Sequence, residues 1–239
     1  MAVQPWRKGI ITSIENETLD TKRFLIKVPE LASFDFIPGQ FVTLDLPIHE
    51  KPNKRWRSYS IASWPNGTNE FELLIVLNPT GIGTPYLFNE VSVGSEITFR
   101  GAQGVFTLHE PIEKDLYLIC TGTGIAPFRS MVQHIHKNQL TYKNIFLIYG
   151  CRKKDNLMYA PELIQLQSVM KNFHYIPTLS REEWEGKSGY VHDIYEELCK
   201  HTSPANFYLC GWRSMLDEAK ERILKMGYEK KDIHQEIYG

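Results

Sequence analysis

The hydrophobic pattern of this chain changes once, near residue 110, and this change constrains the fold more than any other feature of the sequence. The six short runs before it are rich in β-branched residues, alternate in part, and are separated by turn residues such as Pro38-Gly39 and Asn66-Gly67. After it, wholly apolar runs alternate with amphipathic stretches of helical spacing. Short, regularly spaced strands favour a closed barrel or sandwich, whereas apolar strands alternating with helices favour a doubly wound parallel sheet. The sequence therefore predicts a β domain over residues 1–110 and an α/β domain over residues 111–239, with the linker at 107–115.

Each predicted domain has its own set of elements. In the first domain we expect strands at 9–14, 23–28, 40–46, 58–63, 70–77 and 96–100, and one helix at 84–90. In the second we expect strands at 116–120, 144–149, 174–179, 207–210 and 233–238, and helices at 127–136, 160–170, 191–200 and 214–226. Ligands of open parallel sheets bind at the carboxyl ends of the strands, so the residues that follow these strands are the first candidates for a site.

Composition excludes several classes of protein. The net charge is −1, so the chain lacks the overall basic field that binds nucleic acid or an anionic membrane. No apolar run approaches the roughly 20 residues that span a bilayer, and the N-terminus lacks the long apolar region of a secretory signal. The four cysteines form no C-x-x-C pair and no spacing suited to zinc or an iron–sulfur cluster. We therefore expect no metal, and mostly buried free thiols in a reducing, cytoplasmic compartment.

The run Arg57-Ser58-Tyr59-Ser60 closes a predicted strand of the first domain. It offers a cation for a pyrophosphate, a flat ring to pack on an isoalloxazine, and hydroxyls for the polar edge of that ring, which together suit a flavin dinucleotide. The alternative is a surface arginine on a β hairpin. Two further segments are expected beside the flavin: the backbone of Leu74, Ile75 and Val76 along its edge, and Gly83-Thr84 at a helix start near its second phosphate.

Thr121-Gly122-Thr123-Gly124 follows an apolar strand and precedes a predicted helix in the second domain. Glycine there lets the backbone come close to a pyrophosphate, and the free N–H groups of a helix start favour an anion. The run is not the G-x-G-x-x-G fingerprint, and taken alone it also fits an ordinary strand–helix turn. Together with the flavin run it predicts a second dinucleotide site, and hence hydride transfer between a nicotinamide and a flavin.

Ser180-Arg181 closes the third strand of the second domain. A hydroxyl and a planar guanidinium suit an adenosine 2′-phosphate, with Tyr190 placed to stack on the adenine and Arg152 to add a phosphate contact. The alternative is a surface arginine in a charged run, because Glu182 and Glu183 follow directly.

The order and spacing of four motifs resemble those of the ferredoxin–NADP reductase superfamily over nearly the whole chain. These are Arg57-Ser58-Tyr59-Ser60, Gly122-Thr123-Gly124-Ile125-Ala126-Pro127, Cys210-Gly211 with Met215, and Glu236-Ile237-Tyr238. The resemblance implies a six-stranded antiparallel FAD-binding barrel followed by a doubly wound NAD(P)-binding domain. It also implies NADP as coenzyme, with NAD as the alternative, and ferredoxin, flavodoxin or another small electron-transfer protein as partner.

The resemblance further implies catalytic roles. Ser60 resembles the residue near flavin N5, and Cys210 the residue near nicotinamide C4. Glu236 resembles the carboxylate that assists positioning and proton relay, and Tyr238 the aromatic residue that stacks on the flavin and moves for the nicotinamide. Two residues depart from the family pattern: Gly239 extends past that aromatic residue, and Thr84 replaces the usual serine.

Several alternatives remain at this point. The residues at 184–186 and 189–191 resemble NADH-using electron-transfer components of oxygenases, which would change both the coenzyme and the partner. A free-flavin reductase of the same fold would have little use for a stacking Tyr238. A non-catalytic electron-transfer subunit usually carries a cysteine cluster, which this chain lacks, and a nucleotide-binding sensor would leave Glu236 and Tyr238 unexplained.

Overall fold

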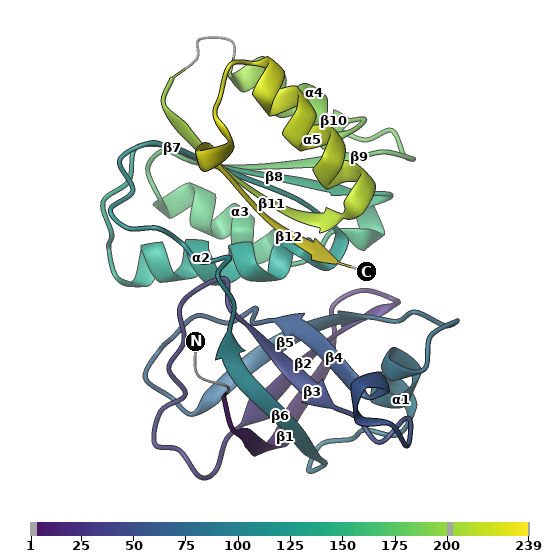
Figure 1. Cartoon of the computed structure of the whole chain (residues 1–239). Coiled ribbons are helices and arrows are strands. Elements are labelled where there is room, and N and C mark those ends of the chain that lie inside the picture. The colour runs from purple at the N-terminus through teal and green to yellow at the C-terminus, as the bar shows by residue number, and fades with distance from the viewer. Residues whose placement is uncertain (1–3, 200–202, 239) are drawn as a thin grey trace. The chain divides into compact units, whose positions relative to one another are not determined.

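The computed structural model describes residues 4–199 and 203–238, which form two compact units, each built on its own sheet (Figure 1). The first unit takes Met1–Leu108 together with Ala126–His134, and the second takes His109–Ile125 and Ile135–Gly239. The boundary at residue 110 stays a prediction, but the assignment of 126–134 to the first unit has consequences discussed below. None of the described helices combines the length and the apolar character that a bilayer span requires.

The first unit is an antiparallel sheet in the order β4-β3-β6-β1-β2-β5. An isolated bridge between Ile61 and Leu73 joins the two edge strands and closes the barrel. All six predicted strands and the helix form, with ends shifted by up to three residues. The strand expected to reach residue 63 ends at Ser60, where its ladder with β3 ends. The elements are β1 (Trp6–Asn16), β2 (Thr21–Lys27), β3 (Phe41–Asp45), η1 (Pro52–Lys54), β4 (Trp56–Ser60), β5 (Glu70–Val76), α1 (Gly83–Asn89) and β6 (Glu96–Gln103).

The barrel core is aromatic at its centre. Phe34, Phe71 and Phe99 are buried, and their ring centroids lie 4.8 to 5.7 Å apart. Inward residues of the strands surround them because side chains alternate between the two faces of a strand. Each fully buried ring of this kind contributes roughly 1.5–3 kcal/mol of hydrophobic stabilisation, so these three fix the barrel on which the site residues are mounted.

The second unit is a parallel sheet in the order β10-β9-β8-β7-β11-β12. The order reverses beside β7, as in doubly wound folds. Lys187–Ser188 was not predicted as a strand, because a polar pair of residues carries no hydrophobic signal; α4 was expected to reach Lys200, which lies outside the described residues. The elements are β7 (Asp115–Thr121), η2 (Gly122–Gly124), α2 (Ile125–Lys137), β8 (Ile145–Cys151), η3 (Lys154–Asn156), α3 (Ala160–Val169), β9 (Phe173–Leu179), β10 (Lys187–Ser188), α4 (Val191–Leu198), β11 (Ala205–Trp212), α5 (Arg213–Lys225), η4 (Lys230–Asp232) and β12 (Ile233–Tyr238).

The two faces of the parallel sheet have different partners. Tyr117, Ile119, Phe207 and Leu209 belong to a buried cluster with residues of α4 and α5. Because side chains alternate, their neighbours along the strands, such as Tyr208 and Cys210, point to the opposite face. This alternation decides which residues at the strand ends meet.

The segment Ala126–His134 packs with the barrel through polar and aromatic contacts. The Arg129 guanidinium donates to the carbonyl oxygen of Ala62 at 3.0 Å and to Glu72 Oε1 at 3.1 Å. The rings of Phe106 and Phe128 lie 5.9 Å apart. Arg129 is only 6% exposed, so this ion pair is nearly dry.

Candidate functional site

Two of the predicted flavin residues of the barrel, Arg57 on β4 and Gly83 at the start of α1, lie against each other. The Arg57 side chain lies against the backbone of Gly83, where an added Cβ would come within 2.9 Å of Arg57 Nε and 3.2 Å of its Cγ. Any residue larger than glycine would push this guanidinium aside. Arg57 also donates to the carbonyl oxygens of Trp56 and Lys54, at 2.7 and 3.1 Å, which orients the side chain. A guanidinium held beside bare backbone fits the pyrophosphate of FAD.

Tyr59 and Ser60 follow Arg57 on β4 but differ in burial. Tyr59 packs against the barrel core, and burial raises the pKa of its hydroxyl to about 12, opposed by the nearby Arg57 charge. The phenol is therefore neutral at physiological pH. Ser60 is 3% exposed. Ser58 is exposed, and its Oγ lies 3.0 Å from Thr43 Oγ1, so alternation places it on the opposite face from Arg57 and Tyr59.

The other two predicted flavin segments lie on β5 and α1. Leu74 and Ile75 are buried, and Val76 at the end of β5 is 36% exposed. Thr84 accepts a hydrogen bond on Oγ1 from the backbone N–H of Asn78 at 2.8 Å, so its hydroxyl holds the loop before α1. The usual serine of the family would keep this hydroxyl.

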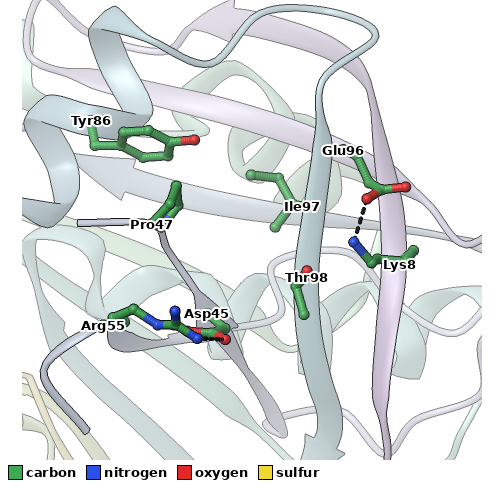
Figure 2. A pocket seen from close by; sticks show the side chains of 8 residues that line it. All are labelled: Lys8, Asp45, Pro47, Arg55, Tyr86, Glu96, Ile97 and Thr98. Carbon is green, nitrogen blue, oxygen red and sulfur yellow. Dashed lines mark hydrogen bonds and ion pairs between the residues drawn. The ribbon is translucent and has the colours of Figure 1, made fainter. Parts of the chain in front are cut away.

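A cavity of about 260 Å³ lies elsewhere on the barrel and includes none of the predicted flavin residues (Figure 2). Its charged groups are paired with one another: Lys8 with Glu96, and Arg55 with Asp45, where Arg55 Nε lies 2.7 Å from Asp45 Oδ1. The lining comprises Lys8, Asp45, Pro47, Arg55, Tyr86, Glu96, Ile97 and Thr98.

The residues predicted to bind the pyridine nucleotide meet in the second unit, where two glycines bring β7 and β11 together. A Cβ on Gly124 would lie 2.4 Å from the carbonyl oxygen of Cys210. A Cβ on Gly211, whose φ is +153°, would lie 2.4 Å from Thr121 Oγ1 and 2.9 Å from Met215 Cε. The turn predicted from the sequence and the predicted Cys-Gly pair therefore meet at the carboxyl ends of adjacent strands.

The junction of β7 and β11 contains an unsatisfied polar group and open space beside the backbone. Thr121 Oγ1 is buried and has no hydrogen-bond partner among the described residues. Gly122 adopts φ +54°, and nothing lies within 4 Å of where its Cβ would stand. Thr123 is half-buried in η2 between the two glycines. An unsatisfied buried hydroxyl beside open backbone fits a polar ligand such as the diphosphate of NAD(P).

Cys210, Glu236 and Tyr238 meet at the ends of β11 and β12. Cys210 pairs in register with Glu236, and Trp212 with Tyr238. Cys210 is fully buried; burial chiefly, and then the Glu236 charge, raise the pKa of its thiol, and a hydrogen bond with Tyr238 opposes them. The thiol is therefore protonated at neutral pH and has the character of a small packing group, not of a nucleophile. Gly239 lies outside the described residues.

The predicted adenosine-end residues lie on exposed loops after β8 and β9. Ser180 N–H and Arg181 N–H donate to the carbonyl oxygens of Cys151 and Arg152, each at 3.0 Å. These bonds bring Arg152 and Arg181 together. Tyr190, which precedes α4, is 71% exposed, so its ring is available to stack.

One polar cluster was not predicted from the sequence. It is formed by three residues that are far apart in the sequence: His109, Tyr208 and His234. The His234 ring stacks on the Tyr208 ring, with centroids 4.5 Å apart, and the His109 ring meets the His234 ring edge-on, with centroids 4.6 Å apart. His109 N–H donates to Tyr208 Oη at 3.2 Å. Isolated histidines in a sequence give no signal of such a contact, because it depends on the register of β11 and β12.

Comparison with known families identifies the two domains. A family model described as an oxidoreductase FAD-binding domain matches residues 8–108, and one described as an oxidoreductase NAD-binding domain matches residues 118–221. The fold and the two family matches thus define the class of two-domain FAD- and NAD(P)-binding oxidoreductases.

Individual relatives narrow this class. Ferredoxin–NADP reductase B of Sorangium cellulosum is 31% identical over 100% of this chain and 95% of its own length. A ferredoxin–NADP⁺ reductase structure from Neisseria gonorrhoeae, with bound FAD and NADP, superposes with a TM-score of 0.82 at 27% identity, covering 97% of this chain and 98% of that one. The chain belongs to the ferredoxin–NADP reductase family.

Two longer relatives are 34% and 28% identical to this chain over the matched residues. The anthranilate 1,2-dioxygenase electron transfer component of Acinetobacter baylyi is 34% identical over 78% of this chain. That match spans 53% of the length of the Acinetobacter protein. The match with the 2-halobenzoate 1,2-dioxygenase electron transfer component of Burkholderia cepacia spans 61% of the length of that protein.

Proposed function

We propose that this protein oxidises NADPH and passes the electrons one at a time, through FAD, to a separate small electron-transfer protein such as ferredoxin or flavodoxin. The observation that carries the proposal is the pair of glycine junctions: Gly83 under Arg57 in the barrel, and Gly124 with Gly211 between β7 and β11. At each junction a missing side chain lets a polar group lie against bare backbone, and Gly122 beside the second junction has open space where its Cβ would stand, which together suit one dinucleotide at each junction. We place the activity in the cytoplasm, in keeping with four free cysteines.

In the proposed reaction, the residues of this chain bind, orient and gate. FAD, when bound, supplies the chemistry: it accepts a hydride and releases single electrons. Arg57 holds its pyrophosphate, neutral Tyr59 packs on it, and Ser60 offers a hydroxyl at its reactive edge. Cys210, held protonated, packs beside the nicotinamide, Glu236 orients it and exchanges a proton with solvent, and Tyr238 moves to admit it. Orienting the two reacting groups supplies most of the rate acceleration.

A second candidate is an NADH-dependent reductase component of an oxygenase. It is favoured by the similarity to the dioxygenase electron transfer components and by the residues at 184–186. The two candidates differ in coenzyme and in partner but share the FAD chemistry.

The first experiment is an absorbance spectrum of the purified protein followed by anaerobic titration with NADPH and with NADH. Bound FAD that is bleached faster by NADPH supports the leading proposal. Faster bleaching by NADH favours the oxygenase reductase, and colourless protein that reduces added flavin favours a free-flavin reductase. Protein that neither binds nor reduces flavin contradicts the proposal.

Substitution of Arg181 tests the coenzyme assignment. Arg181→Ala removes the planar donor set for the 2′-phosphate, so we expect kcat/KM for NADPH to fall about tenfold or more while that for NADH changes little. Stopped-flow FAD reduction with both coenzymes measures this. An equal loss with both coenzymes would show that Arg181 has a structural role.

A further inference from the structure

Two carboxylates close to Arg181 in the sequence make bonds of their own in the folded chain. Glu182 Oε2 accepts a hydrogen bond from the backbone N–H of Lys154 at 2.9 Å. Glu185 Oε1 lies 2.8 Å from Lys154 Nζ. Both therefore bind to η3, the short turn that follows β8, although 28 and 31 residues separate the partners.

The loop between Arg181 and Lys187 is fixed at further points. Trp184 Nε1 donates to the Lys187 carbonyl oxygen at 2.7 Å. The Trp184 ring lies over Gly186, where a Cβ would come within 2.4 Å of it. Arg181 N–H donates to the carbonyl oxygen of Arg152, two residues before η3, and Glu185 bonds to Lys154, so the loop is attached at two points to the segment that follows β8.

Arg181 itself is exposed, and its guanidinium forms no hydrogen bond or ion pair with any residue in 4–199 or 203–238. In an ordinary charged run, the flexible Glu185 would compete for that guanidinium and repel a phosphate. Because Lys154 holds Glu185, Arg181 is left to an external anion.

We propose that Lys154 is a positioning residue for coenzyme selectivity: by holding Glu185 it keeps Arg181 available to the 2′-phosphate of NADPH. The inference rests on the function proposed above. Lys154 acts through Glu185 and need not touch the coenzyme. The hydrogen bond from Lys154 to Glu185 also raises the pKa of the ammonium group and lowers that of the carboxyl group, so both remain charged over the working range.

The test measures dissociation constants of adenosine 2′,5′-bisphosphate and of 5′-AMP on the FAD-loaded full chain by calorimetry at low ionic strength. Lys154→Met should weaken the bisphosphate about threefold, the size of effect expected from one unpaired carboxylate in a solvated loop, and leave 5′-AMP unchanged. Lys154→Met/Glu185→Gln should restore wild-type affinity, and Lys154→Arg should retain it. Added salt should reduce the difference, because exposed charges are screened.

Lys225→Met is the matched control, because it also removes one exposed lysine from a pair, with Glu221 on α5 at 2.6 Å. It should leave both ligands unaffected; a bisphosphate-specific loss equal to that of Lys154→Met would mean that net charge alone sets the affinity, and would overturn the inference.

Two other results would also overturn it. If Glu185→Gln fails to restore the Lys154→Met variant, Lys154 binds the phosphate directly. If both ligands weaken equally, the turn has only a structural role. Failure of the proposed function differs from these: it would appear in the wild-type protein as absence of FAD reduction by both NADPH and NADH, whereas the inference fails with that reaction intact.

Discussion

At the scale of single residues, the site depends on glycines whose missing side chains make room for others. Gly83 gives room to Arg57, Gly124 to the Cys210 carbonyl group, and Gly211 to Thr121. Gly83 and Gly124 were candidates from the sequence because each stands at a predicted helix start beside a threonine, and Gly211 was a candidate through the family resemblance. The sequence did not reveal which atoms they approach, since those atoms lie on other elements.

Gly211→Ala should destabilise the second unit by about 2 kcal/mol or more, because it adds steric overlap with Thr121 to an unfavourable φ of +153°. Urea unfolding measures the change. Gly122→Ala is the control: its φ is +54° but its surroundings are open, so only about 1 kcal/mol of backbone strain is expected. Equal losses for the two variants would contradict the crowding argument.

Tyr238→Ser should raise the use of NADH relative to NADPH, because the proposed gate in front of the flavin would lose its ring. The same change removes a hydrogen bond from Cys210. Steady-state kinetics with both coenzymes provide the ratio, and an unchanged ratio would be evidence against gating by this residue.

At the scale of elements, the strands and helices were predictable because most carry a strong hydrophobic period. The parallel strands β7 and β8 are nearly continuous apolar runs, and α2 and α5 have clear amphipathic spacing. Short polar elements such as β10 have no such period and were missed. The register of β12 against β11, which joins Cys210 to Glu236, depends on packing between distant segments and was expected only through the family resemblance.

His234, near the start of β12, makes the stability of the second unit depend on pH. Burial chiefly, and then the charges of His109 and Lys114, lower the pKa of His234 from 6.5, whereas Asp232 opposes them. The folded protein therefore binds this proton less readily than the unfolded chain. The contribution of neutral His234 to the free energy of unfolding is therefore fully present above pH 6.5. It is lost as the pH falls below 6.5 towards the lower pKa that His234 has in the folded protein.

His234→Phe should remove this contribution while keeping an aromatic ring against Tyr208. We expect the free energy of unfolding of the second unit to fall less steeply between about pH 7 and 5 in the variant than in the wild type. Urea titrations at several pH values test this. Parallel profiles for the two proteins would show that His234 does not titrate differently on folding.

At the scale of the whole molecule, the change of pattern near residue 110 predicts two domains, and the contacts within the chain form two compact units. The boundary at residue 110 stays a prediction. The exception to the predicted division is Ala126–His134, which the hydrophobic pattern assigns to the second domain and the contacts assign to the first. A helical period predicts a helix but not which neighbour it packs on.

Arg129 tests this assignment. Arg129→Met should destabilise the barrel unit by about 3 kcal/mol, because it removes the buried cation that lies 3.1 Å from the largely buried Glu72 carboxylate. Arg129→Met/Glu72→Gln should recover part of the loss. A change below about 0.5 kcal/mol in urea unfolding, the usual size for a surface substitution, would mean that the segment contributes little to the barrel.

The interleaving of the two units along the chain has a consequence for recombination. A domain exchange with a relative at a single cut near residue 110 would replace the Ala126–His134 helix turns together with the pyridine-nucleotide sheet. In such a chimera, Phe106, Ala62 and Glu72 of the barrel would contact helix residues from the other protein. Chimeras within this family should therefore tolerate exchange best when the helix surface that carries Phe128 and Arg129 is inherited with the barrel.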